Sequence, residues 1–145
     1  MHFAIGADEF DPVLDVLASE LRSLGHEVTR LGAAPGAPAP WGSVAIEIGR
    51  RVAAGQVDQG IVCCYTGTGV SMAANKVPGV RAALCVDAET AKGARQWNDA
   101  NVLALSLRLT SSTVAKEIVR AWSSTAYGGT EGESLAAIRG AEERD

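Results

Sequence analysis

The chain has 145 residues, of which 47% are hydrophobic and 21% charged, and its formal net charge is −4. This length and composition predict one globular domain over residues 1–145 with a sizeable core. The acidic balance argues against a nucleic-acid partner, which needs a basic face. No apolar run approaches the ~20 residues of a membrane span, and no secretion signal opens the chain. We therefore expect a cytoplasmic protein with no membrane partner.

The pattern of strand-like runs and helical repeats follows a regular alternation. In chain order it predicts a strand at 3–5, a helix at 12–24, a strand at 27–31, a helix at 43–54, a strand at 60–64, a helix at 70–75, a strand at 81–86, a helix at 89–96, a strand at 102–105, and helices at 112–122 and 133–143. Residues 142–145 are expected to fray. Such alternation predicts an α/β fold with a parallel, doubly wound sheet of five strands.

Three cysteines occur, at positions 63, 64 and 85. An odd number in a chain without a signal peptide does not indicate a disulfide framework. Cys63 and Cys64 are neighbours in a predicted strand, so they point to opposite faces and should not bridge. Because the chain has no CxxC motif and no histidine pair at ligand spacing, we expect no structural zinc.

The segment after the strand at 60–64 carries the most chemistry. Ligands of open α/β sheets bind at the carboxyl ends of the strands. Here Cys64 is followed by Tyr65, Thr66 and two glycines, at 67 and 69, and then by a predicted helix. Glycines permit tight turns, and free N–H groups at a helix start form a hole for an anion. The loop by itself leaves two interpretations open: an anion hole, or a tight turn without a ligand.

A cysteine at this position suits proton transfer. The positive end of a helix stabilises a nearby thiolate, so Cys64 could remove a proton next to a carbonyl while the loop stabilises the enediolate. The competing interpretation is a buried structural cysteine, which we prefer for Cys63 and Cys85. For Cys64, spacing alone leaves both open. Polar residues also follow the first and fourth strands, namely Asp8, Glu9 and Asp87.

Several segments resemble one known family. Residues 60–76, Gly-Ile-Val-Cys-Cys-Tyr-Thr-Gly-Thr-Gly-Val-Ser-Met-Ala-Ala-Asn-Lys, resemble the active-site stretch of ribose-5-phosphate isomerase B and of galactose-6-phosphate isomerase subunits. Residues 79–82 and 95–104 resemble the family's next signatures. Residues 6–8 and 127–129 are similar to its first strand end and its C-terminal motif. The resemblance extends over nearly the whole chain, in order.

The resemblance implies a Rossmann-like three-layer αβα sandwich and a homodimer or homotetramer whose active sites are shared between subunits. It also implies a metal-independent aldose–ketose isomerisation through a cis-enediol, without a cofactor. The base would be Cys64, because Val70 stands where another branch of the family has a glutamate. The remaining roles would fall to Thr66 and the backbone at Gly67, Thr68 and Gly69 for the enediolate, Asn98 for substrate oxygens, and Asp8 for substrate hydroxyls.

Departures from the family pattern concern substrate recognition. Trp97 replaces a ring-opening histidine and cannot exchange a proton in that role. Glu9 replaces a histidine, and Tyr65 replaces a glycine. Residues 38–40 lack the family's substrate-facing tyrosine. Two phosphate-holding arginines are replaced by Thr130 and Ser134, which leaves Arg108 as the remaining basic anchor.

Two hypotheses follow. The first is an isomerase acting on an altered sugar or sugar phosphate that is acyclic, short or non-phosphorylated, with Glu9, Tyr65 and Trp97 among the residues that bind it. The retained residues around Cys64 favour this hypothesis. The second is a non-catalytic or partner-dependent subunit of a hetero-oligomeric isomerase, or a sugar-binding module, which the changes at 97, 130 and 134 favour.

Overall fold

The structure is a computed structural model that describes residues 1–143. Strands and helices alternate along these residues as predicted. Their order is β1 (His2–Ala7), α1 (Pro12–Ser23), β2 (Glu27–Gly32), α2 (Trp41–Ala53), β3 (Gln59–Cys64), α3 (Thr68–Ala74), β4 (Ala82–Leu84), α4 (Ala88–Asn98), β5 (Val102–Ser106), α5 (Ser112–Ser124) and α6 (Gly132–Glu142).

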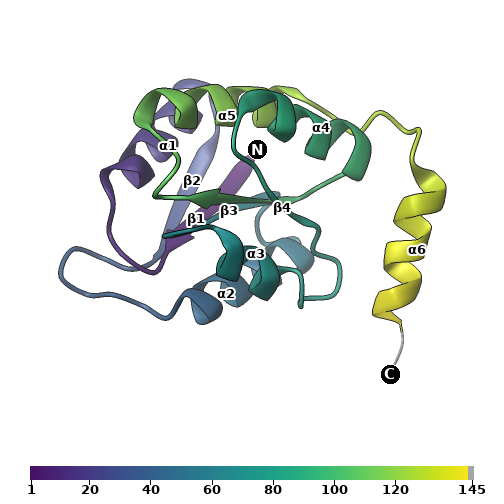
Figure 1. Cartoon of the computed structure of the whole chain (residues 1–145), viewed down its shortest axis with the longest axis horizontal. Coiled ribbons are helices and arrows are strands. Elements are labelled where there is room, and N and C mark those ends of the chain that lie inside the picture. The colour runs from purple at the N-terminus through teal and green to yellow at the C-terminus, as the bar shows by residue number, and fades with distance from the viewer. Residues whose placement is uncertain (144–145) are drawn as a thin grey trace.

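The five strands form one parallel sheet in the order β2-β1-β3-β5-β4. Helices α1, α4 and α5 cover one face and helices α2 and α3 the other (Figure 1). The predicted Rossmann-like αβα sandwich with a five-stranded parallel sheet is therefore confirmed. The strand order changes direction between β1 and β3, and such a switch point opens a crevice at the carboxyl ends of the two strands.

Each face of the sheet has its own apolar core. The strand residues Phe3, Ile61 and Leu103 pack with α1 and α5, and the largest side chain in this core is the fully buried Trp122. On the other face Val62 and Val102 pack with α2 and α3. Alternation along β3 sends Cys63 into the first core and Cys64 into the second, as predicted for neighbours in a strand.

Some element boundaries differ from the prediction. Helix α2 begins at Trp41 instead of Ser43, directly after an extended Pro40. Helix α3 begins at Thr68 instead of Val70, because the left-handed backbone of Gly67 already turns the chain into it. Strand β4 ends at Leu84 instead of Val86, shortly before Asp87 caps α4 through the backbone N–H of Thr90.

Helix α6 lies outside the three layers, beyond the edge that β4 forms (Figure 1). The prediction of fraying from residue 142 was wrong for Glu142, because it ends α6 and its carboxylate accepts a hydrogen bond from the Gly79 backbone at 3.0 Å. Residues 144 and 145 of that prediction lie outside the described residues. Within residues 1–143, none of the helices combines the length and apolar character that crossing a membrane requires.

Candidate functional site

The crevice between β1 and β3 holds a cavity of about 350 Å³. This volume lies within the range of small-molecule pockets. Its walls come from the end of β1, the start of α2, and the loop from β3 into α3: Asp8, Trp41, Cys64, Tyr65, Thr66, Thr68, Gly69 and Met72. The structure thus brings together most of the residues predicted for the chemistry, from three separate segments of the chain.

Cys64 and Asp8 meet at the base of this cavity because their strands are neighbours. Ala7 of β1 is in register with Cys63 of β3, so the residues that follow each of them lie at the same level. The Cys64 residue is only 6% exposed. The Oδ1 atom of Asp8 is buried without a hydrogen-bond partner among residues 1–143. An unpaired buried acceptor is costly, so Asp8 presents an oxygen suited to a hydroxyl of a ligand.

The loop after Cys64 is fixed by the loop after β5. The Leu107 N–H donates to the Cys64 carbonyl at 2.9 Å, and the Arg108 N–H donates to the Tyr65 carbonyl at 3.0 Å. The hydroxyl of Ser106, which is buried, also donates to the Tyr65 carbonyl, at 2.9 Å. These contacts hold the backbone of the loop in place, so its later residues face the cavity in a defined geometry.

Gly67 gives the loop its sharp turn. Its φ of +76° is in the left-handed region, where a side chain is strained. A Cβ there would lie 2.9 Å from both the Leu105 carbonyl carbon and the Ser106 nitrogen. Only glycine therefore fits against the end of β5 at this position. The turn also places the Thr66 and Thr68 hydroxyls 2.8 Å apart at the start of α3.

Two cavity residues were missed by the sequence analysis, Trp41 and Met72. The Trp41 ring packs on Gly69, where an added Cβ would lie 3.0 Å from the ring. Trp41 is 47% exposed and Met72 is 63% exposed. The signal in the sequence was an aromatic residue directly after Pro38-Ala39-Pro40, the segment that lacks the family's tyrosine. Trp41 therefore supplies an aromatic wall from a neighbouring position.

A second cavity, of about 330 Å³, adjoins the first, and Asp8 and Tyr65 line both. Its other walls are Glu9, Phe10, Asp11 and Leu107. Asp11 is committed to the N-cap of α1, where it accepts from the Val13 N–H at 2.8 Å. Glu9 is exposed and available to a ligand. Within residues 1–143 no lysine or arginine lines either cavity, so both are electrostatically suited to a neutral part of a ligand.

Asn98 and Trp97 lie near the amino ends of the strands, on the opposite side of the sheet from the carboxyl ends where Cys64 lies; we call these two sides the amino edge and the carboxyl edge. They end α4, which leads into the amino end of β5, whereas Cys64 pairs with Ser106 at the carboxyl end of β5. The length of β5 alone separates the two levels by about 13 Å. The Trp97 ring packs on Gly93 of its own helix, and Asn98 lines a different cavity of about 640 Å³ beside α6. One chain therefore does not bring Asn98 or Trp97 to Cys64.

The other predicted anchors are also distributed. Arg108 follows β5 at the same edge of the sheet as Cys64 and is exposed. Thr130 and Ser134 are exposed and lie at the start of α6, and neither lines the two cavities around Asp8. Glu131 and Glu133 stand beside them, and their charge would repel a phosphate.

The remaining cysteines are structural. Burial raises the pKa of the Cys63 thiol far above its ordinary value, and the Cys64 thiol adds to this effect. Burial, with a smaller contribution from Asp87, raises the pKa of Cys85 to about 12. Both thiols stay protonated near neutral pH, as expected for cysteines inside apolar runs. Within residues 1–143 no three His, Cys, Asp or Glu side chains are grouped so as to hold a metal ion.

The fold and this site define an α/β protein with a small-molecule cavity at the switch point of a parallel sheet. Residues 3–138 match the Ribose/Galactose Isomerase family model. The chain belongs to this family of aldose–ketose isomerases, and the resemblance found in the sequence is confirmed.

Relatives in this family act on different sugars. Ribose-5-phosphate isomerase B of Escherichia coli is 37% identical over 143 residues, which are 97% of this chain and 96% of that protein. D-erythrulose-4-phosphate isomerase of Pectobacterium atrosepticum is 37% identical over 124 residues, or 84% of this chain and 82% of that protein. The DNA damage-repair/toleration protein DRT102 of Arabidopsis thaliana is 44% identical over 125 residues; these are 84% of this chain but only 39% of that protein.

Solved structures agree with these relatives. The type B ribose 5-phosphate isomerase of Trypanosoma brucei superposes with a TM-score of 0.92 at 39% sequence identity, and the match covers 97% of each chain. This likeness supports the same overall course of the backbone in both chains.

Proposed function

We propose that the chain is an aldose–ketose isomerase in which Cys64 is the base and the reaction passes through a cis-enediolate. The observation that supports this most directly is the content of one cavity. Cys64, Thr66, Thr68 and Asp8 all line it, and the Asp8 Oδ1 atom is buried without a partner among residues 1–143. These are a base, donors for a developing oxyanion, and an acceptor for a substrate hydroxyl.

The proposed reaction moves one proton between two neighbouring carbons. The Cys64 thiolate removes a proton from the carbon next to the carbonyl, and negative charge develops on the carbonyl oxygen. Hydroxyl and backbone N–H donors of residues 66–69 stabilise this charge, so the step needs no metal. The thiol then returns the proton to the former carbonyl carbon. The hydroxyl proton on the neighbouring carbon moves to the former carbonyl oxygen, so that this neighbouring carbon becomes the new carbonyl. Asp8 accepts a hydrogen bond from a substrate hydroxyl and keeps the two reacting carbons next to the sulfur.

The proposed substrate is a short sugar in its open-chain form. Trp97 stands where a ring-opening histidine is usual, and an open-chain substrate does not need that step. A tetrose 4-phosphate is such a compound, because esterification of its O4 leaves no hydroxyl able to close a furanose ring. The relative named D-erythrulose-4-phosphate isomerase supports this class. Arg108 is our candidate for a phosphate contact, since it is exposed at the same edge of the sheet.

We also propose that the site is completed by a second copy of the chain. Asn98 and Cys64 lie at opposite edges of the sheet in one chain, so both can contribute to one site only if a partner supplies Asn98. Large exposed apolar side chains line the Cys64 cavity and the cavity that adjoins it, as on a surface that binds a partner. They are Trp41, Tyr65 and Met72 in the first cavity and Phe10 in the second.

Deuterium exchange followed by NMR tests this function. The protein is incubated in heavy water with four- and five-carbon aldoses and ketoses, each with and without a terminal phosphate. We expect deuterium next to the carbonyl of the four-carbon compounds and loss of this exchange in Cys64→Ala. Cys85→Ala, which removes a thiol from the opposite core, should retain it.

Two outcomes would contradict the proposal. Full exchange by Cys64→Ala would exclude Cys64 as the base. No exchange with any sugar, from folded wild-type protein, would favour the second hypothesis, a subunit that needs a different partner chain. Exchange confined to the five-carbon compounds would retain the chemistry and overturn the substrate class.

A further inference from the structure

The turn between α4 and β5 has an unusual backbone. Asp99 directly follows Asn98 and has a φ of +46°, the only positive value for a residue other than glycine within residues 1–143. Aspartate tolerates this left-handed conformation better than most residues, but it still persists only where its surroundings enforce it. Strained backbone next to a predicted active-site residue calls for an account of what holds it.

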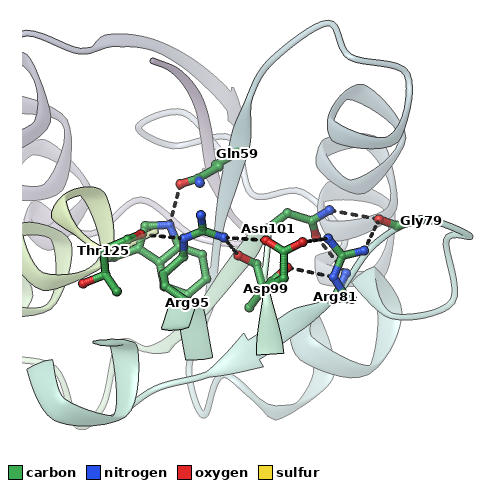
Figure 2. Close-up of polar contacts among 9 residues, drawn as sticks. Gln59, Gly79, Arg81, Arg95, Asp99, Asn101 and Thr125 are labelled. Atoms are coloured by element: carbon green, nitrogen blue, oxygen red, sulfur yellow. Dashed lines mark hydrogen bonds and ion pairs between the residues drawn. The ribbon is translucent and has the colours of Figure 1, made fainter. Parts of the chain in front are cut away.

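Two arginines hold Asp99 from both sides (Figure 2). Arg81 donates to the Asp99 carbonyl through Nε at 2.7 Å and to its Oδ2 through Nη2 at 3.2 Å. Arg95 reaches Oδ1 through Nη1 at 3.5 Å. The carboxylate thus balances two partly buried guanidinium groups. These contacts fix both the main chain and the side chain of Asp99, and so they fix the conformation of the turn.

Arg95 ties the turn to the core below it. Its guanidinium also donates to the carbonyls of Ala100 and Thr125 and lies 5.7 Å from the centre of the Trp122 ring. Trp122 is anchored in turn by a buried hydrogen bond to Gln59 at 2.7 Å (Figure 2). The turn is therefore connected to α5 and to β3, the strand that ends in Cys64.

Arg81 ties the same turn to the segment before β4. Its backbone N–H donates to Asn101 Oδ1 at 2.8 Å, and Asn101 Nδ2 donates to the Gly79 carbonyl at 2.9 Å. Residues on both sides of Asn98 are therefore fixed. The Asn98 side chain itself is exposed and has no hydrogen-bond partner among residues 1–143. The network ends at the backbone that carries Asn98 and leaves its amide free to bind something else.

We infer that Asp99, Arg81 and Arg95 are positioning residues, which fix the turn so that the Asn98 amide is held out in one orientation toward a substrate. This inference rests on the proposed function, in which Asn98 completes the site of a second copy. If the network only stabilised the fold, it would have no reason to surround Asn98, whose side chain it leaves without a hydrogen bond. Orientation of a substrate contact within about 1 Å affects the rate of an enzyme up to a hundredfold.

The test compares two variants at position 99, each with and without Asn98→Ala. Asp99→Gly keeps a residue that adopts positive φ freely but removes the carboxylate, so its effect reports the ionic contacts and not backbone strain. Asp99→Asn tolerates the same φ and keeps one acceptor oxygen. We expect kcat to fall at least about tenfold in Asp99→Gly with KM nearly unchanged, and to be partly rescued in Asp99→Asn. In the Asn98→Ala background, Asp99→Gly should cause little further loss.

A matched control and a second measurement separate the possible failures. Glu47→Gln removes a carboxylate from the Arg51 ion pair on α2, and it should leave kcat unchanged. The order parameter of the Asn98 side-chain amide, measured by NMR, should fall in Asp99→Gly. An equal loss of kcat in both backgrounds, or an unchanged order parameter, would overturn the inference. Wild-type protein without any isomerase activity would count against the proposed function, and the order parameter would still decide whether the network positions Asn98.

Discussion

At the carboxyl edge of the sheet, a buried Asp8 oxygen has no partner among residues 1–143, and large apolar side chains such as Tyr65 are exposed. At the amino edge, the carboxylate and carbonyl of Asp99 accept hydrogen bonds from Arg81 and Arg95, which also donate to main-chain carbonyls. The carboxyl edge leaves polar and apolar groups without the partners that they would find in a protein interior. At the amino edge the charged groups around Asp99 are paired within the chain, and only the neighbouring Asn98 amide is left free.

This difference indicates that the two edges have different roles in the chain. The carboxyl edge costs stability in the free chain, and a ligand or a second copy can recover that cost by binding. The amino edge has its partners already, so binding there can change little except at Asn98, which the network leaves free. Exposed reactive groups should therefore lie at the carboxyl edge, and three experiments examine how that edge divides buried groups from those that line its cavity.

The largest effect is expected for the reactivity of the cysteines. The pKa of Cys85 is about 12, so at pH 8, four units lower, about one Cys85 thiol in 10⁴ is ionised. Burial raises the pKa of the Cys63 thiol further. Iodoacetamide at pH 8 should label Cys64, which lines an open cavity, and leave the other two unmodified. Peptide mass spectrometry of native protein measures this, and labelling in denaturant gives the reference of three modified cysteines.

Equal labelling of all three cysteines in native protein would contradict the assignment of Cys63 and Cys85 as buried structural residues and of Cys64 as the cysteine that lines an open cavity.

The pKa shifts of Cys63 and Cys85 also affect stability. Burial favours the protonated thiols of Cys63 and Cys85, so their contribution is complete below the ordinary pKa of 9.0 and is lost as the pH rises toward 12. Cys63→Ala and Cys85→Ala should flatten that alkaline decline of the unfolding free energy.

The next effect distinguishes two nearby glycines, Gly67 before α3 and Gly69 in its first turn. Gly67→Ala places a Cβ in a left-handed backbone and 2.9 Å from main-chain atoms at the end of β5, which cannot move aside. We expect at least about 2 kcal/mol of lost unfolding free energy and a large loss of exchange activity. Gly69→Ala meets only the half-exposed Trp41 ring, which can shift, so its cost should stay below about 1 kcal/mol. Chemical denaturation of both variants measures the lost unfolding free energy, and equal losses in the two variants would contradict this account.

The sequence predicted the strands and helices well because their apolar periodicity is strong, and it singled out the Cys64 loop, which lines a cavity, because those residues are contiguous. It could not show that the Asp8 Oδ1 atom is buried without a hydrogen-bond partner among residues 1–143, since that depends on the register of β1 and β3. It also could not show the Arg81–Asp99–Arg95 contacts. These join segments that are close only after folding, and ordinary surface charges have the same appearance in a sequence.

The wall of the cavity was missed for a related reason. A tryptophan at the start of a helix is usually a packing residue, and only the fold brings Trp41 over Gly69 and beside Cys64. Met72 was similarly read as part of a helix, although it is exposed at the same cavity. Contacts of this kind depend on the direction in which α2 and α3 leave the sheet.

The smallest effect concerns that wall. Trp41 packs on Gly69 and lines one side of the cavity. With the proposed function, we expect it to limit the length of sugar that can lie against Cys64. Trp41→Ala should lower kcat/KM for a four-carbon substrate several-fold and shift the preference toward five-carbon substrates, because one extra carbon unit in a pocket is worth about 1–3 kcal/mol. Trp41→Phe keeps an aromatic ring against Gly69 and should keep the original preference. Competition between the two substrates in one reaction gives the ratio directly. An unchanged ratio in Trp41→Ala, with the fold intact, would mean that the exposed apolar side chains at this edge serve only to contact a second copy.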